Sequence, residues 1–190
     1  TEAPWLHGDW RTVDDSGRLL AEFRPPLNGP IAALLVAGEG LPLQASLVSA
    51  AAFFRCGGFD ISEAVLGVED RDLGRRLALS GEVAHVPALV AEVRVGESTS
   101  TTPWKALCGR DRWGREKALR AAGAFARLRA SAQSSYWRGR LCRAYFASMM
   151  WNLERLSLAT AARRAAAAAT LAGPSALTSA FWSGLRTQIK

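Results

Sequence analysis

The segment from Arg55 to Gly81 constrains the fold more than any other part of this 190-residue chain. A glycine pair, Gly57-Gly58, comes first, and an acidic pair, Glu69-Asp70, follows after ten further residues. Leucines four residues apart come next, and Gly81 stands where a helix commonly ends in a left-handed turn. The pattern predicts a glycine turn, a loop, and then a helix of about ten residues that begins at Asp70.

The first turn of this predicted helix is acidic, because it holds Glu69, Asp70 and Asp72. Carboxylates at a helix start accept hydrogen bonds from free backbone N–H groups and complement the helix dipole. The same field keeps a carboxylate ionised at neutral pH, which it needs if it is to accept a proton from a hydroxyl group. These residues by themselves fit either a helix cap or a catalytic base.

The order and spacing of these residues resemble the second half of the family 2 glycosyltransferases, inverting enzymes of the GT-A type. The family pattern reads Gly-Gly-Phe-Asp, about eight residues, and then Glu-Asp-x-Asp-Leu-x-x-Arg-Leu-x-x-x-Gly. The matching residues are Gly57 to Asp60, Glu69 to Leu73, Arg76-Leu77 and Gly81.

Flanking segments extend the resemblance over residues 7 to 103. They are His7 to Trp10, Asp14 to Arg18, Arg24 to Pro26, Val83 to Arg94, and Ser98 to Ser100. The last of these belongs to a polar loop, Ser98 to Thr102, that is either a linker or a lid over the donor.

The resemblance implies transfer of a sugar from a nucleotide-sugar donor to an acceptor hydroxyl, with inversion. Asp70 would be the general base, and Glu69 would orient the acceptor or Asp70. The acceptor-binding candidates, which the resemblance places around the base, are Gly57, Gly58, Phe59, Asp60 and Arg94. The expected partners are the nucleotide-sugar and a glycan or lipid-linked acceptor.

One part of the family pattern is missing. In the family, an Asp-x-Asp motif in the first half of the fold holds Mg²⁺ or Mn²⁺ against the donor diphosphate, and no such motif precedes Gly57. The histidine that often follows the closing strand is also absent, because Arg94 is followed by Val-Gly-Glu. His7 and His85 lack ligand spacing. We therefore expect the divalent metal to be bound in a full-length protein and not by this chain alone. We also expect this chain, as an acceptor-side fragment, to be inactive by itself.

Charge divides the chain at Pro103. Residues 1–103 hold 8 Lys or Arg and 14 Asp or Glu, a net charge of −6, whereas residues 104–190 hold 16 and 3, a net charge of +13. We predict an α/β acceptor-side half of a GT-A, Rossmann-like domain in residues 1–103 and a basic, amphipathic helical tail in residues 104–190.

The α/β part alternates strand and helix signals. Residues 31–35 predict a short helix or buried run, residues 44–54 a strand that leads into the glycine turn, and residues 83–95 a strand with Pro87 near an edge or bend. His85 lies within the last strand and is interpreted as a strand-face residue rather than a catalyst.

The second part predicts helices over residues 104–128, 136–158 and 159–172, the last ended by Gly173-Pro174. Trp113 is interpreted as a helix-packing residue. The basic residues of this part fit a solvated face, an anionic membrane surface or, less well, nucleic acid. The alternative function is therefore a non-catalytic binding module whose basic helices contact one of these partners.

Cysteine usage and hydropathy bear on location. Cys56, Cys108 and Cys142 are odd in number and widely spaced, which indicates reduced thiols rather than a disulfide framework or a zinc site. No run approaches the roughly 18 apolar residues of a spanning helix. We expect a cytoplasmic protein that can act at the inner face of the membrane.

Overall fold

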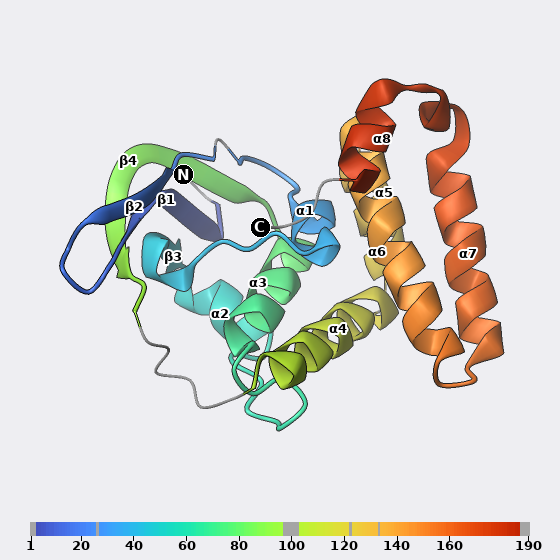
Figure 1. The fold of residues 1–190 in the computed structure, drawn as a ribbon, viewed down its shortest axis with the longest axis horizontal. Coiled ribbons are helices and arrows are strands. Elements are labelled where there is room, and N and C mark those ends of the chain that lie inside the picture. Colours follow the sequence, from blue (N-terminus) through green and yellow to red (C-terminus); the bar gives the residue numbers. More distant parts are fainter. Residues whose placement is uncertain (1–2, 26, 97–102, 122, 133, 187–190) are drawn as a thin grey trace. The chain divides into compact units, whose positions relative to one another are not determined.

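A computed structural model describes residues 3–25, 27–96, 103–121, 123–132 and 134–186 of the chain. The protein is of the predicted mixed α/β class (Figure 1). It forms two compact units: residues 1–31 and 40–111 make up the first, and residues 32–39 and 112–190 the second, helical unit. The units divide eight residues beyond Pro103, between Asp111 and Arg112. The predicted loop Ser98 to Thr102 lies outside the described residues.

The first unit is built on a mixed four-stranded sheet. Its central strand, β1 (Trp5–Val13), pairs in parallel with β4 (Val83–Arg94). On its other side β1 pairs antiparallel with β3 (Ser46–Val48) near its start and with β2 (Leu19–Phe23) near its end. The prediction of a strand from residue 83 is thereby confirmed.

Pro87 lies where the pairing of β4 with β1 is interrupted. Val86 pairs with Gly8 and Leu89 with Asp9, so Pro87 and Ala88 form a bulge opposite β1. A proline has no N–H to contribute to a sheet, and bulges are among the places where strands tolerate it. The predicted bend at Pro87 is confirmed.

The predicted strand over residues 44–54 is mostly wrong. Only β3 is extended there; a 3₁₀ turn (Leu43–Ala45) precedes it and the helix α2 (Ala50–Arg55) follows it. Ser49 caps α2, since its side chain accepts a hydrogen bond of 3.2 Å from the backbone N–H of Ala52. That cap and three consecutive alanines stabilise a helix more than the apolar run stabilises a strand.

The helix α3 (Glu69–Ser80) confirms the predicted acidic helix. It buries Leu73 and Leu77 in the first unit, as their spacing of four residues predicts. The prediction of a left-handed end at Gly81 is wrong, because Gly81 has φ −170° and continues as extended backbone into β4. Gly57 and Gly58 have φ of +89° and +65°, values that favour glycine, so the predicted glycine turn is present.

The second unit is helical. It contains α1 (Ala32–Ala37), α5 (Ala124–Ser131), α6 (Ser135–Leu153), α7 (Leu158–Ala172), a 3₁₀ turn (Gly173–Leu177) and α8 (Ser179–Arg186). The helix α4 (Trp104–Arg120) spans the division between the units. The predicted helical character of residues 104–172 and the short buried helix near residue 31 are confirmed. The predicted bounds are partly wrong, because residues 104–128 divide into α4 and α5 at Gly123, with φ +72°, and α6 ends at Leu153 rather than at residue 158.

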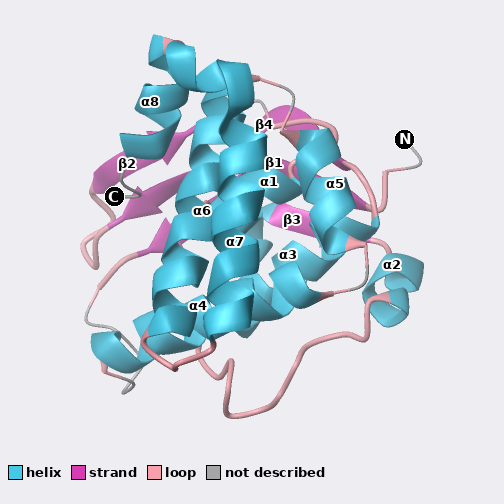
Figure 2. Ribbon diagram, turned by 90° about the vertical axis from the view of Figure 1, so that its right-hand side faces the viewer, coloured by secondary structure: helices cyan, strands magenta, loops and turns pink. Residues whose placement is uncertain are grey.

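The helix α6 is the centre of this unit. Figures 1 and 2 show α6 and α7 side by side and antiparallel, with α8 folded back along α6. Gly139 and Gly184 permit this approach, because a Cβ on Gly139 would overlap the carbonyl oxygen of Phe181 and a Cβ on Gly184 that of Tyr136. None of the helices among the described residues is long and apolar enough to cross a membrane.

Candidate functional site

Arg76 joins the glycine turn to the acidic helix. Its Nη1 donates hydrogen bonds of 2.7 Å to the carbonyl oxygens of Cys56 and Gly58. Its Nε and Nη2 lie 2.8 and 2.7 Å from Oδ2 of Asp72, one helical turn earlier. One guanidinium therefore fixes the backbone on both sides of Gly57 against α3, and the structure brings together the two ends of the sequence motif.

The three acidic residues at the start of α3 have different surroundings. Asp72 is 1% exposed and is the ion-pair partner of Arg76. Glu69 is half-buried and accepts a hydrogen bond of 2.5 Å from the backbone N–H of Gly67. Asp70 is exposed and accepts one of 2.7 Å from the N–H of Arg71. Asp72 is thus structural, and of the three only Asp70 is open to solvent.

The remaining acceptor-binding candidates lie in two places. Phe59 is exposed beside the glycine turn, with its ring edge-on to that of Phe53 at 5.6 Å between centroids. Asp60 accepts a hydrogen bond of 2.9 Å from the N–H of Ser62 and orders the loop that follows. Arg94 is exposed at the end of β4, and no hydrogen bond or ion pair among the described residues joins it to Glu69 or Asp70. The structure therefore groups the candidates around the glycine turn but leaves Arg94 unconnected to them.

Three arginine contacts that the sequence analysis missed also hold this region. Arg75, buried in α3, lies 2.5 Å from Oδ1 of Asp111, and Arg71 lies 3.8 Å from the same oxygen. Arg110 donates a hydrogen bond of 2.7 Å to the carbonyl oxygen of Leu66, in the loop before α3. These contacts anchor the acidic helix to the part of α4 that belongs to the first unit. The two residues of each contact lie 36 to 44 residues apart in sequence, so no local sequence pattern predicts these contacts.

A second polar cluster lies between β1 and β4. His85 Nε2 lies 2.7 Å from Oδ1 of Asp9, and the His7 and His85 rings lie 4.9 Å apart. His7 Nε2 donates a hydrogen bond of 2.9 Å to the carbonyl oxygen of Leu27. All three side chains are nearly buried, so the cluster joins the two strands rather than facing a substrate. In the part of the chain that the structure describes, no group of three or more His, Cys, Asp or Glu could hold a metal ion.

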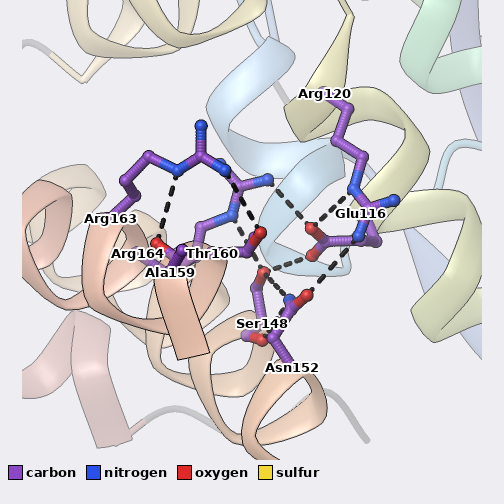
Figure 3. A network of polar contacts seen from close by, with 8 residues as sticks. All are labelled: Glu116, Arg120, Ser148, Asn152, Ala159, Thr160, Arg163 and Arg164. Carbon is purple, nitrogen blue, oxygen red and sulfur yellow. Dashed lines mark hydrogen bonds and ion pairs between the residues drawn. The ribbon is translucent and has the colours of Figure 1, made fainter. Parts of the chain in front are cut away.

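The second unit contains a buried network around Glu116 (Figure 3). Arg164 of α7 lies 2.9 Å from Oε1 of Glu116, Arg120 lies 3.1 Å from the same oxygen, and Ser148 of α6 donates to Oε2. Asn152 accepts from Arg120 at 3.4 Å and donates to the carbonyl oxygen of Ser148 at 2.8 Å. The network ties α4, α6 and α7 together.

The electrostatics of this network favour an ionised Glu116. Burial opposes ionisation, but hydrogen bonds from Ser148, Arg164 and Asn152 and the charge of Arg164 outweigh it, so the pKa of Glu116 lies below its ordinary value. The cavity beside Glu116, which Arg112, Arg115 and Trp151 also line, measures about 20 Å³. That is room for about one water molecule, so the network is a structural element rather than a substrate site.

The three cysteines are free thiols. Cys56 and Cys108 are half-buried, and Cys142 is fully buried in α6. Burial raises the pKa of Cys142 to about 11, so its side chain is a neutral thiol at physiological pH. Its Sγ lies 3.3 Å from the carbonyl oxygen of Ala168, which makes it a packing residue between α6 and α7.

Comparison of the chain with models of known protein families, with curated proteins and with solved structures found no match.

Proposed function

We propose that residues 7–103 form the acceptor-side half of a GT-A, Rossmann-like domain of an inverting glycosyltransferase. The observation that carries the proposal is the contact of Arg76 with both ends of the motif, which holds the Gly57-Gly58 turn against α3. If the acidic residues served only to cap the helix, no other part of the motif would be required. Such a cap would not need a glycine turn and an arginine that clamps this turn to the same helix.

Asp70 has the properties that the chemistry requires of the general base. It is an exposed carboxylate in the first turn of a helix, and it accepts a hydrogen bond from the backbone N–H of Arg71. Asp70 would take the proton of the acceptor hydroxyl as its oxygen bonds to the anomeric carbon. The bond from that carbon to the donor phosphate breaks, and the electron pair leaves with the nucleoside diphosphate. Positioned proton transfer of this kind typically contributes ~10²–10⁴-fold in rate.

The donor diphosphate and its metal would be held outside this chain. In the family that the motif resembles, the ligands of Mg²⁺ or Mn²⁺ belong to an Asp-x-Asp motif, and no such motif precedes Gly57 in this sequence. In the full-length protein, an Asp-x-Asp segment would bind the ion, which neutralises the leaving diphosphate. Glu69, fixed by the N–H of Gly67, would orient Asp70 or the acceptor.

The test is an exchange of one carboxylate for its amide in the full-length protein. We expect Asp70→Asn to lower kcat by at least about a hundredfold, because the amide keeps the shape and loses the base. The release of nucleoside diphosphate from a panel of nucleotide-sugars measures turnover. Glu63→Gln, an exposed carboxylate in the loop before α3, is the matched control and should leave kcat unchanged. Normal turnover by Asp70→Asn would remove Asp70 from the mechanism.

A further inference from the structure

The turn between α6 and α7 exposes apolar side chains. Leu156 is 83% exposed and Leu158 is 63% exposed, and Leu153 at the end of α6 is also exposed. Met150 lies one turn earlier on α6 and continues the same surface. We call these four residues the apolar turn. Such side chains gain nothing from contact with water, and a contiguous exposed set marks an interaction site.

The backbone of the turn is well defined and holds one leucine under strain. The N–H of Leu156 donates to the carbonyl oxygen of Leu153 at 2.9 Å, and that of Ser157 to the carbonyl oxygen of Asn152 at 2.9 Å. Leu156 has φ +57°, a region that glycine or asparagine occupies at lower energy. A leucine at this position adds nothing to the packing of the unit, which indicates that its side chain serves a contact outside it.

Arginines lie in and near the apolar turn. Arg155 follows α6 and stacks over the ring of Trp151, with its Cζ 3.9 Å from the ring centroid. Arg163 is exposed on the second turn of α7, and Arg120 reaches the end of α6 at Asn152 (Figure 3). Two exposed arginines, Arg155 and Arg163, therefore lie close in sequence to Leu156 and Leu158.

The acidic residues of the second unit do not offset this charge. Glu39 forms an ion pair with the buried Arg140, and Glu116 is buried among Arg164, Arg120 and Ser148. Of the acidic residues that the structure describes in this unit, Glu154 alone is exposed. Each of these two pairs removes one acid and one arginine, so the net charge of the surface is unchanged, and Glu154 beside Arg155 is the one described acidic residue exposed among the remaining arginines of the unit.

This pairing also changes the interpretation of Arg163 and Arg164. The two residues are adjacent in a sequence that predicts a basic helix surface, but Arg164 is buried and bonded to Glu116. Reversal of its charge would break the unit itself. Arg120 is also bonded to Glu116, so Arg155 and Arg163, both exposed, are the residues of this region available to an anionic partner.

We propose that the apolar turn docks this protein on the surface of an anionic lipid bilayer. The leucines would lie at the boundary of headgroups and acyl chains, and Arg155 and Arg163 would contact lipid phosphates. A nucleic acid would match the arginines but would gain nothing from aliphatic side chains at their centre. The proposal does not depend on glycosyl transfer, since it rests on the second unit alone.

The test is sedimentation of the 190-residue chain with vesicles of phosphatidylcholine, with and without phosphatidylserine. We expect binding only to the vesicles that contain phosphatidylserine, and weaker binding as salt is raised. Leu156→Gly with Leu158→Ser should lower the partition coefficient by at least about tenfold. Arg155→Gln and Arg163→Gln should each lower it by roughly fivefold at low salt. Leu156→Gly also relieves the positive φ, so it leaves the fold intact.

One matched control comes from just beyond the other end of α7, roughly 22 Å away for a helix of this length, and the other from the end of α8. Leu177→Ser removes a leucine that is 91% exposed, and Arg186→Gln removes an exposed arginine; both should bind as the unaltered chain does. The absence of vesicle binding, or equal losses in these controls, would overturn the proposal. Tighter binding to duplex DNA that ignores the leucine substitutions would overturn it in favour of nucleic acid.

Discussion

Replacement of Arg76 by alanine tests whether one side chain holds the glycine turn against the acidic helix. The substitution removes a bidentate contact to Asp72 and two hydrogen bonds to the carbonyl oxygens of Cys56 and Gly58. Asp72, 1% exposed, would lose its guanidinium partner while remaining buried. The change is thus confined to the region that carries the proposed function.

The magnitude follows from the burial of this pair. Loss of one partner of a buried ion pair costs about 3–5 kcal/mol, and each hydrogen bond to a charged group contributes about 1.5–3 kcal/mol. These figures describe overlapping losses, so we expect Arg76→Ala to lower the free energy of unfolding of the first unit by about 3–5 kcal/mol. The free energy of unfolding of Arg76→Lys should lie between those of the unaltered protein and Arg76→Ala. An ammonium keeps the positive charge but cannot form the planar arrangement of bonds to the carboxylate and both carbonyl oxygens.

Denaturant unfolding and amide hydrogen exchange measure this effect. Exchange at the backbone amides of residues 56–60 should accelerate in Arg76→Ala, since the turn loses its attachment to α3. Arg71→Ala is the control on the same helix: its side chain is 46% exposed and its contact with Asp111 is 3.8 Å, so a loss under about 1 kcal/mol is expected. If Arg76→Ala were as stable as Arg71→Ala and the turn remained protected, Arg76 would not be the clamp.

Two further predictions concern the second unit. The pKa of Glu116 in the folded state lies below its ordinary value of 4.5. The stability that its network contributes should therefore be present above about pH 4.5 and be lost as the pH falls through the lower folded-state pKa. Glu116→Gln should flatten this dependence of the melting temperature on pH in thermal melts. Gly139→Ala should lower the free energy of unfolding by about 1–3 kcal/mol or more, because the new methyl group overlaps the backbone of α8. Gly109→Ala in α4 is the control: the new methyl group has open space around it, so the free energy of unfolding should rise by up to about 1 kcal/mol.

The sequence predicted well those helices and strands whose positions are set by residues close to one another in the chain. Leucine spacing and an acidic first turn located α3, and strand signals from residue 83 onward located β4. Alanine-rich runs located α7, and Gly173 ends that helix as predicted. The strand prediction over residues 44–54 failed because a serine cap and helix propensity outweighed an apolar run that fits either element.

In the candidate site, too, the sequence predicted the features that neighbouring residues define and missed the contacts between distant residues. The motif predicted the acidic helix and the glycine turn, and the spacing of Asp72 and Arg76 is that of an ion pair within one helix. The two bonds from Arg76 to the turn could not be read from that spacing, since they cross 18 and 20 residues of loop and helix. The role of Asp72 as a structural partner rather than a catalytic acid follows only from its burial.

The sequence by itself determined the local order of turns, helices and strands, because each depends on side chains within a turn or a strand period of one another. It also determined the charge difference between the two parts of the chain. Only the tertiary structure decided which charges reach the surface: Arg164 meets Glu116 across 48 residues, and Arg140 meets Glu39 across 101. Such pairs depend on which faces of distant helices pack together, and burial then removes them from the surface that a partner would meet.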